Sequence, residues 1–314
     1  MTPPVIEAID LSKTYDSFKA LSSLNLKIEG SKCVGFLGPN GSGKTTTLKI
    51  FTALISATTG KAMINGVDVS RNKKQALASC GALIETPEIY PSFTPREALM
   101  MIAEIRGIPK EDRNKRIEEA VFQVRMEDWM NKRVGKFSKG MKQRINIAAA
   151  LLSDPSIVLL DEPSTGLDPK GMNEVREIVR SLKDKNKLIF MSSHLLGEVT
   201  DICEEVALID HGKLLVYDKL ENVTSKFSNL GHFIDIGLSR NVDDDVNTRI
   251  STLDGVDCVE KSGPRSLKLK LKGGVDAQEK VLNELVSMKC GVISFKESSF
   301  ALEEAYLSLV KDAL

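Results

Sequence analysis

The sequence predicts an α/β fold built on a buried parallel sheet, followed by a small α+β domain. Four short apolar runs each lead into a loop or a helical pattern: CVGFLG, IVLLD, LIFMS and VALID. Such runs are typical of strands that are buried on both faces of a parallel sheet. The 314 residues are enough for two domains. Because the pattern changes after about residue 230, we expect these domains at 1–230 and 231–314.

Composition argues against several classes of protein. Formal net charge is zero, so global charge indicates no nucleic-acid partner. No apolar run reaches the length of a membrane span, and the N-terminus MTPPVIEAID lacks the basic and apolar segments of a signal peptide. Five scattered cysteines without a CxxC pair indicate a reducing compartment, and three distant histidines argue against a zinc site.

A helical subdomain is expected at about 86–152. Its first helix begins with Thr94 as N-cap, Pro95 at the first helical position and Glu97 closing a capping box. Residues 106–144 contain 12 Lys or Arg against 6 Asp or Glu. This excess indicates either a solvated helical face or a surface that docks on an anionic membrane or an acidic partner loop.

The second domain is predicted from the order of its elements. FIDIGL, VDCVEK, SLKLKLK and GVISF are strand-like, and helical patterns follow the first and the third of them. The resulting order β-α-β-β-α-β matches a ferredoxin-like unit. A last helix is expected from about residue 301.

The segment GPNGSGKTT predicts a phosphate-binding loop (P-loop). It fits the pattern G-x-x-x-x-G-K-[ST] and lies between a strand and a helical run. Glycines let backbone N–H groups converge on phosphate oxygens, and the helix N-terminus adds the positive end of its dipole. Lys44 should reach the β- and γ-phosphates of ATP as a catalytic residue, and Thr45 should hold Mg²⁺. The expected nucleotide-binding residues are Gly38, Pro39, Asn40, Gly41, Ser42, Gly43, Lys44, Thr45 and Thr46.

A pair of carboxylates ends the apolar run SIVLL. Asp161 is the expected partner of Mg²⁺, and Glu162 is then free to orient or deprotonate an attacking water as a general base. Consecutive strand residues point to opposite faces, but at the end of a strand the chain is already turning. The alternative is two acidic residues on a sheet edge without a catalytic role.

Together with these motifs, FSKGMKQR and LDEPSTGLD make residues 4–220 resemble the ATP-binding subunits of ABC transporters. In that family, the signature motif of one subunit, usually LSGGQ, closes over the γ-phosphate held by the other subunit. The resemblance implies that Ser138 and Gly140 make this contact, helped by their helix N-terminus. The local alternative is an ordinary helix capped by Ser138.

The resemblance extends to three single positions. Asp168 in STGLDP is similar to the D-loop residue that acts across the dimer interface. His194 in MSSHLL is similar to the switch histidine, which senses the γ-phosphate and helps to hold the transition state. Tyr15 is similar to the aromatic residue that stacks on adenine, with a structural tyrosine at a strand end as the alternative.

Two departures from the family pattern stand out. Glu85 occupies the place where the family usually has Gln, and a carboxylate accepts hydrogen bonds but does not donate them. We expect Glu85 to be a ligand of Mg²⁺, and the same Glu occurs in the bacitracin- and lantibiotic-resistance branch of the family. Lys139 and Met141 replace Gly and Gln of the signature, so selectivity for adenosine across the interface should be low.

The function that the resemblance implies is ATP hydrolysis coupled to export by a transporter of the ABC-2 type. Two copies would close on ATP and bind a separate transmembrane permease at the cytoplasmic face of the membrane, and no nucleic acid is expected. Residues 301–308, ALEEAYLS, are similar to the end of the tail domain that such exporters often carry. The alternative is an ABC ATPase that acts on nucleic acid, ribosomes or cofactor assembly. The short segment between Lys44 and Ser138 leaves no room for the coiled coil of DNA-repair members.

Overall fold

The chain divides into two compact units, Met1–Lys219 and Leu220–Leu314. The division falls before the expected boundary at residue 230, and residues 224–231 lie outside the described part of the chain. Within the described part, every helix is too short or too polar to span a lipid bilayer. The computed structural model describes residues 3–85, 88–223, 232–242, 244–273 and 275–297.

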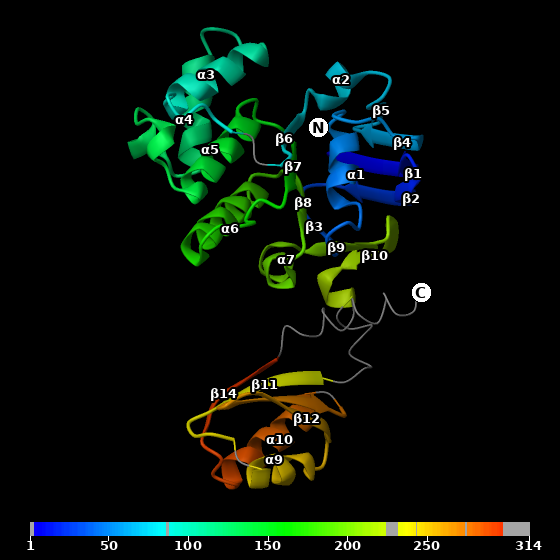
Figure 1. The fold of residues 1–314 in the computed structure, drawn as a ribbon, viewed down its shortest axis with the longest axis vertical. Coiled ribbons are helices and arrows are strands. Elements are labelled where there is room, and N and C mark those ends of the chain that lie inside the picture. Colours follow the sequence, from blue (N-terminus) through cyan, green and yellow to red (C-terminus); the bar gives the residue numbers. More distant parts are fainter. Residues whose placement is uncertain (1–2, 86–87, 224–231, 243, 274, 298–314) are drawn as a thin grey trace. The chain divides into compact units, whose positions relative to one another are not determined.

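A six-stranded sheet in the order β10-β9-β3-β8-β7-β6 lies at the centre of the first unit (Figure 1). Its strands are parallel except β10, which joins the edge antiparallel to β9. β3, β7 and β8 are buried along their whole length, as expected for strands covered on both faces. The predicted parallel sheet is therefore confirmed. The strands are β3 (Cys33–Leu37), β6 (Cys80–Leu83), β7 (Ile157–Asp161), β8 (Leu188–Ser193), β9 (Glu205–Asp210) and β10 (Lys213–Lys219).

The first unit also contains a four-stranded antiparallel sheet that the apolar runs did not predict. Its order is β2-β1-β4-β5. In Figure 1, helix α1 (Lys44–Phe51) lies beside this sheet, and Leu24, Leu48 and Phe190 join the two sheets and the helix in one buried core. The helix that follows the P-loop is therefore held between two sheets. The strands are β1 (Val5–Tyr15), β2 (Phe18–Glu29), β4 (Thr59–Ile64) and β5 (Val67–Asp68).

The predicted helical subdomain consists of α3 (Pro95–Ile105), α4 (Arg113–Gln123) and α5 (Lys139–Leu151), which form a separate lobe in Figure 1. The capping box of α3 is confirmed. Thr94 Oγ1 accepts a hydrogen bond from the Glu97 backbone N–H at 3.2 Å, and the Glu97 carboxylate accepts one from the Thr94 N–H at 2.8 Å. Further helical segments are α2 (Lys73–Leu77), η1 (Glu127–Trp129), η2 (Val134–Lys136), α6 (Pro169–Lys183) and α7 (Leu196–Ile202).

The second unit has the predicted element order β-α-β-β-α-β. Its strands form one antiparallel sheet in the order β12-β13-β11-β14, which is the strand order of a ferredoxin-like unit. The helix expected from about residue 301 lies outside the described residues. The elements are β11 (His232–Leu238), α9 (Asp244–Ser251), β12 (Val256–Gly263), β13 (Ser266–Leu271), α10 (Val275–Ser287) and β14 (Val292–Glu297).

Candidate active site

The P-loop connects β3 to α1, and its shape requires glycine. Gly43 has a φ of +106°, in the region that side chains disfavour. A Cβ atom on Gly38 would lie 2.2 Å from the carbonyl oxygen of Ile209 and 2.6 Å from Ser42 Oγ. Gly41 faces open space, since a Cβ there would meet nothing within 4 Å. The loop therefore presents bare backbone at the N-terminus of α1, where N–H groups can face phosphate oxygens.

Lys44 directs its ammonium group to the mouth of this loop. Its Nζ donates hydrogen bonds to the carbonyl oxygens of Gly38 at 2.8 Å and Pro39 at 3.0 Å. It also lies 3.7 Å from Glu162 Oε1, and its side chain is 4% exposed. Burial lowers the pKa of Lys44, and the negative charges of Glu162 and Asp161 oppose this effect. A buried cation next to bare backbone is suited to bind a phosphate.

Oxygen atoms that could ligate a metal ion lie close together where β7 ends. Asp161 Oδ1 accepts hydrogen bonds from Thr45 Oγ1 at 3.1 Å and from Ser192 Oγ at 2.6 Å. Carboxylate and hydroxyl oxygens are hard ligands of the type that Mg²⁺ prefers, so Thr45 and Asp161 fit this ion. Within the described residues, the buried Oγ of Ser42 has no hydrogen-bond partner. Its hydroxyl group could donate a hydrogen bond to a phosphate oxygen.

Glu162 is turned toward the same end of the sheet as Asp161 by its backbone. Its φ is +44°, a left-handed conformation that is uncommon outside glycine. The Glu162 N–H donates to Ser192 Oγ at 2.9 Å. Its carboxylate Oε2 accepts a hydrogen bond from Thr165 Oγ1 at 2.8 Å and lies 3.0 Å from His194 Nδ1. The three expected catalytic residues, Lys44, Glu162 and His194, are therefore in contact through one carboxylate.

The signature segment and the D-loop lie next to each other, at the N-termini of α5 and α6. Ser138 is the N-cap of α5, and its Oγ accepts a hydrogen bond from Met141 N at 3.2 Å. Asp168 is the N-cap of α6 and accepts from Gly171 N at 2.9 Å. Gly140 is buried, and a Cβ on it would lie 3.5 Å from the Cα of Gly171. No hydrogen bond joins these caps to the P-loop within the residues that the structure describes.

Two further expected site residues make no hydrogen bond or ion pair with this cluster in the described part of the chain. Glu85 is 66% exposed, and its carboxylate pairs with Lys49 Nζ at 2.5 Å rather than with Thr45 or Asp161. Tyr15 lies at the end of β1 and is 42% exposed. Lys13 Nζ lies 4.9 Å from the centre of the Tyr15 ring. The proposed roles of both residues stay predictions.

Ser192 and Thr165 are functional candidates that the motifs did not predict. Both bond to Glu162, and Ser192 also bonds to Asp161. Ser192 is completely buried and is the register partner of Asp161 in the parallel pairing of β7 and β8. Ser192 is the first polar residue after the apolar run LIFM and lies two residues before His194, and this pattern is the sequence signal that could have identified it.

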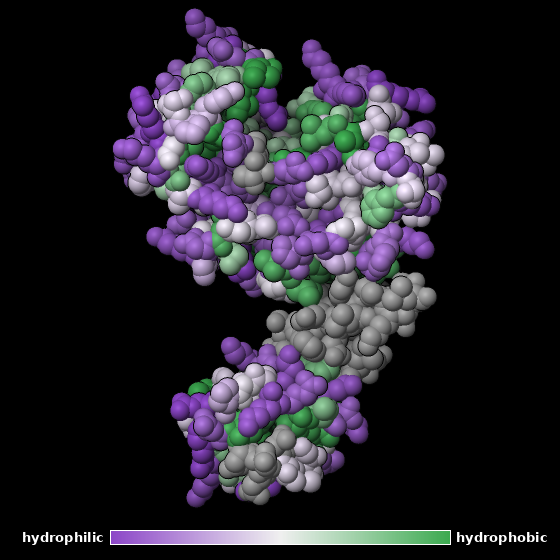
Figure 2. Space-filling model, viewed as in Figure 1, coloured by the Kyte–Doolittle hydropathy of each residue, from purple (hydrophilic) through white to green (hydrophobic). Residues whose placement is uncertain are grey.

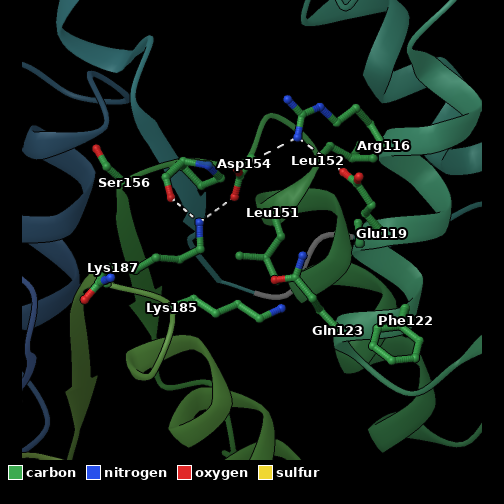
Figure 3. Close-up of a pocket in the computed structure, with 13 residues that line it drawn as sticks. Arg116, Glu119, Phe122, Gln123, Leu151, Leu152, Asp154, Ser156, Lys185 and Lys187 are labelled. Carbon is green, nitrogen blue, oxygen red and sulfur yellow. Dashed lines mark hydrogen bonds and ion pairs between the residues drawn. The ribbon is translucent and has the colours of Figure 1, made fainter. Parts of the chain in front are cut away.

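A hollow of about 590 Å³ lies elsewhere, beside the starts of β7 and β8 and therefore at the end of the sheet opposite Glu162. Figure 3 shows that Lys187 and Arg116 both point toward Asp154. Lys187 Nζ lies 2.7 Å from Asp154, and Arg116 lies 3.8 Å from the same carboxylate. Because the hollow lies at the opposite end of the sheet from Lys44, Asp161 and Glu162, it is not a candidate for the catalytic centre.

The fold and the cluster define a P-loop ATPase domain with a helical lobe, and comparison with known proteins identifies the family. A family model described as ABC transporter matches residues 21–165. The bacitracin transport ATP-binding protein BcrA of Bacillus licheniformis is 41% identical over 227 residues, covering 71% of this chain and 73% of BcrA. The lantibiotic transport ATP-binding protein SrtF of Streptococcus pyogenes is 34% identical, covering 70% of this chain and 94% of SrtF.

Solved structures agree with this assignment. An ATP-binding subunit of an ABC transporter has a TM-score of 0.63 at 27% identity, covering 71% of this chain and 93% of that subunit. A dimeric ATP-binding cassette in a post-hydrolysis state, bound to ADP and Pi, has a TM-score of 0.61 at 25% identity, covering 68% and 98%. The chain belongs to the ATP-binding proteins of ABC transporters, and it is an ATP-binding ATPase of that family.

Proposed function

We propose that this protein powers an ABC exporter through ATP-driven closure of a homodimer. The observation that carries the proposal is the contact of Lys44, Glu162 and His194 at the mouth of the P-loop. The cap of α5 at Ser138 makes no hydrogen bond to this cluster within the described chain. We therefore expect the Ser138 segment of a second copy to complete the site. The dimeric state of a similar cassette bound to ADP and Pi supports this arrangement.

Each residue of the cluster has a distinct chemical role in the proposed reaction. Glu162 accepts hydrogen bonds at Oε2 and can orient or deprotonate a water for attack on the γ-phosphate. Lys44 offsets the negative charge on the phosphates, and His194 contacts the γ-phosphate. Thr45, Asp161 and Glu85 would hold Mg²⁺, which neutralises charge on the β- and γ-phosphate oxygens when bound.

In the closed dimer, Ser138, Gly140 and Asp168 would act on the nucleotide held by the partner copy. The N-terminus of α5 would direct its N–H groups and the positive end of its dipole at the γ-phosphate. Closure would then depend on the γ-phosphate, and hydrolysis would let the copies part.

A transmembrane permease is the second proposed partner. The similarity to bacitracin and lantibiotic transport ATP-binding proteins supports export, with this subunit at the cytoplasmic face of the membrane. Figure 2 shows apolar surface on both sides of a hollow between the α3 lobe and the lobe of the antiparallel sheet. Exposed apolar side chains on or near these elements are Leu54, Tyr90, Met101 and Ile105. Such surface is typical of protein interfaces.

The test is whether a variant that cannot hydrolyse ATP accumulates as an ATP-bound dimer. Glu162→Gln keeps the shape of the side chain but removes the base, so ATP with Mg²⁺ should hold the protein as a dimer of twice 34.4 kDa in light scattering. The control Glu127→Gln, on the exposed segment η1, should keep turnover and give no stable dimer. A monomer alone in the Glu162→Gln sample would contradict the mechanism. The same measurement on a chain ended at residue 230 tests the proposed dimer-stabilising or regulatory role of the second unit.

A further inference from the structure

Glu85 and Lys49 form an ion pair that the proposed chemistry does not explain. Lys49 Nζ lies 2.5 Å from Glu85 Oε1, with the two side chains 28% and 66% exposed. Glu85 follows β6 closely and has a φ of +57°, so the backbone turns sharply where the chain leaves the sheet. In the described part of the chain, the Glu85 carboxylate has this partner alone.

The pair lies within one helical turn of the oxygens that fit Mg²⁺. Thr45 and Lys49 are four residues apart on α1, so their side chains leave the same face of the helix, with Cβ atoms about 5–6 Å apart. Thr45 Oγ1 in turn contacts Asp161 Oδ1 at 3.1 Å. A rotation of the Glu85 side chain along this face would therefore move its carboxylate from Lys49 toward Thr45.

Charge explains why Lys49 matters here. A glutamine at position 85 would carry no formal charge to neutralise, whereas Glu85 carries a carboxylate that Lys49 pairs with. An ammonium group and Mg²⁺ are like charges, so each weakens the binding of the other to one carboxylate.

Resting on the proposed function, we propose that Lys49 is a positioning residue that competes with Mg²⁺ for Glu85. Glu85 exchanges the Lys49 ammonium for the magnesium ion of bound nucleotide, so Lys49 sets the Mg²⁺ concentration at which nucleotide binding is half-maximal. Lys49 itself contacts neither nucleotide nor metal.

The experiment is a double-mutant cycle read by binding rather than by turnover. Binding of a fluorescent, non-hydrolysable ATP analogue at fixed concentration is measured as Mg²⁺ is added. Four full-length proteins are compared: the unchanged protein, Lys49→Met, Glu85→Gln and the double variant. Lys49→Met should lower the half-saturating Mg²⁺ concentration about two- to five-fold, the range expected when a partly exposed ion pair is removed. In the Glu85→Gln background the same change should have no effect, and Lys49→Arg should restore the unchanged protein's value.

Lys27→Met is the matched control, since Lys27 is also a lysine in an ion pair, 2.6 Å from Glu29 on β2. It should leave the Mg²⁺ titration unchanged. If Lys49→Met caused an equal shift with and without the Glu85→Gln change, the inference would be overturned, because the effect would then be a direct action of charge on the metal. No shift in either background would overturn it too. Unchanged protein whose analogue binding ignores Mg²⁺ would instead contradict the proposed magnesium site itself.

Discussion

Replacing Ser192 by alanine removes the hydroxyl that joins the Asp161 carboxylate to the backbone N–H of Glu162 in the candidate active site. Ser192 Oγ donates to Asp161 Oδ1 at 2.6 Å and accepts from the Glu162 N–H at 2.9 Å, and the residue is completely buried. Asp161 keeps its hydrogen bond from Thr45, whereas the Glu162 N–H loses its partner. The left-handed backbone of Glu162 therefore loses one of its supports.

The magnitude follows from the two hydrogen bonds. A hydrogen bond to a charged group contributes about 1.5–3 kcal/mol, and a buried donor without a partner costs about 1–3 kcal/mol. Because losses within one network do not add fully, we expect Ser192→Ala to lower the free energy of unfolding by about 2–4 kcal/mol. Turnover should fall by roughly 10- to 100-fold, since displacement of Glu162 by about 1 Å is enough for such a loss.

Urea unfolding followed by circular dichroism measures the first effect, and steady-state phosphate release measures the second. The control is Ser181→Ala, because among the described residues Ser181 Oγ bonds within α6, to the Ile178 carbonyl oxygen at 2.7 Å. Its effect on the free energy of unfolding should stay within about 0.5 kcal/mol. If Ser192→Ala unfolds at the same urea concentration as the control and keeps its turnover, the role of Ser192 is refuted.

Two further predictions use the packing around glycine and around a buried lysine. Gly140→Ala should fold normally, because the added Cβ would lie 3.5 Å from the nearest atom, but it should weaken the ATP-dependent dimer in light scattering; an unweakened dimer would contradict the role of Gly140. Asp154→Asn should destabilise the protein at neutral pH, because the hydrogen bond from buried Lys187 lowers the pKa of Asp154 in the folded state. That stability is present above the unfolded pKa of about 3.9 and is lost as pH falls toward the lower folded pKa, so the two unfolding curves should converge below about pH 4. A difference that persists in acid would show that the charge of Asp154 is not the cause.

Much of the fold could be predicted because its signals are local. The buried strands, the capping box at Thr94 and the element order of the second unit each depend on neighbouring residues. The antiparallel sheet consists of two local hairpins, β1 with β2 and β4 with β5, but the pairing that joins them is not local: Ile6 on β1 pairs with Ile64 on β4 across the whole P-loop helix. The sheet as a whole was missed for this reason. Ser138 was expected as either a cap or a γ-phosphate contact, and the cap is confirmed.

The sequence by itself determined the chemical groups of this protein: a glycine loop ending in Lys44 and Thr45, and an acidic pair at the end of an apolar strand. Only the tertiary structure decided how they meet. The positive φ of Glu162 brings neighbouring carboxylates to one edge, and the Ser192 hydroxyl links the Asp161 carboxylate to the Glu162 backbone N–H. Glu85 has Lys49 as its partner. The physical reason is that these contacts require β7 to pair with β8 and α1 to lie against the sheet, and no local pattern encodes such packing.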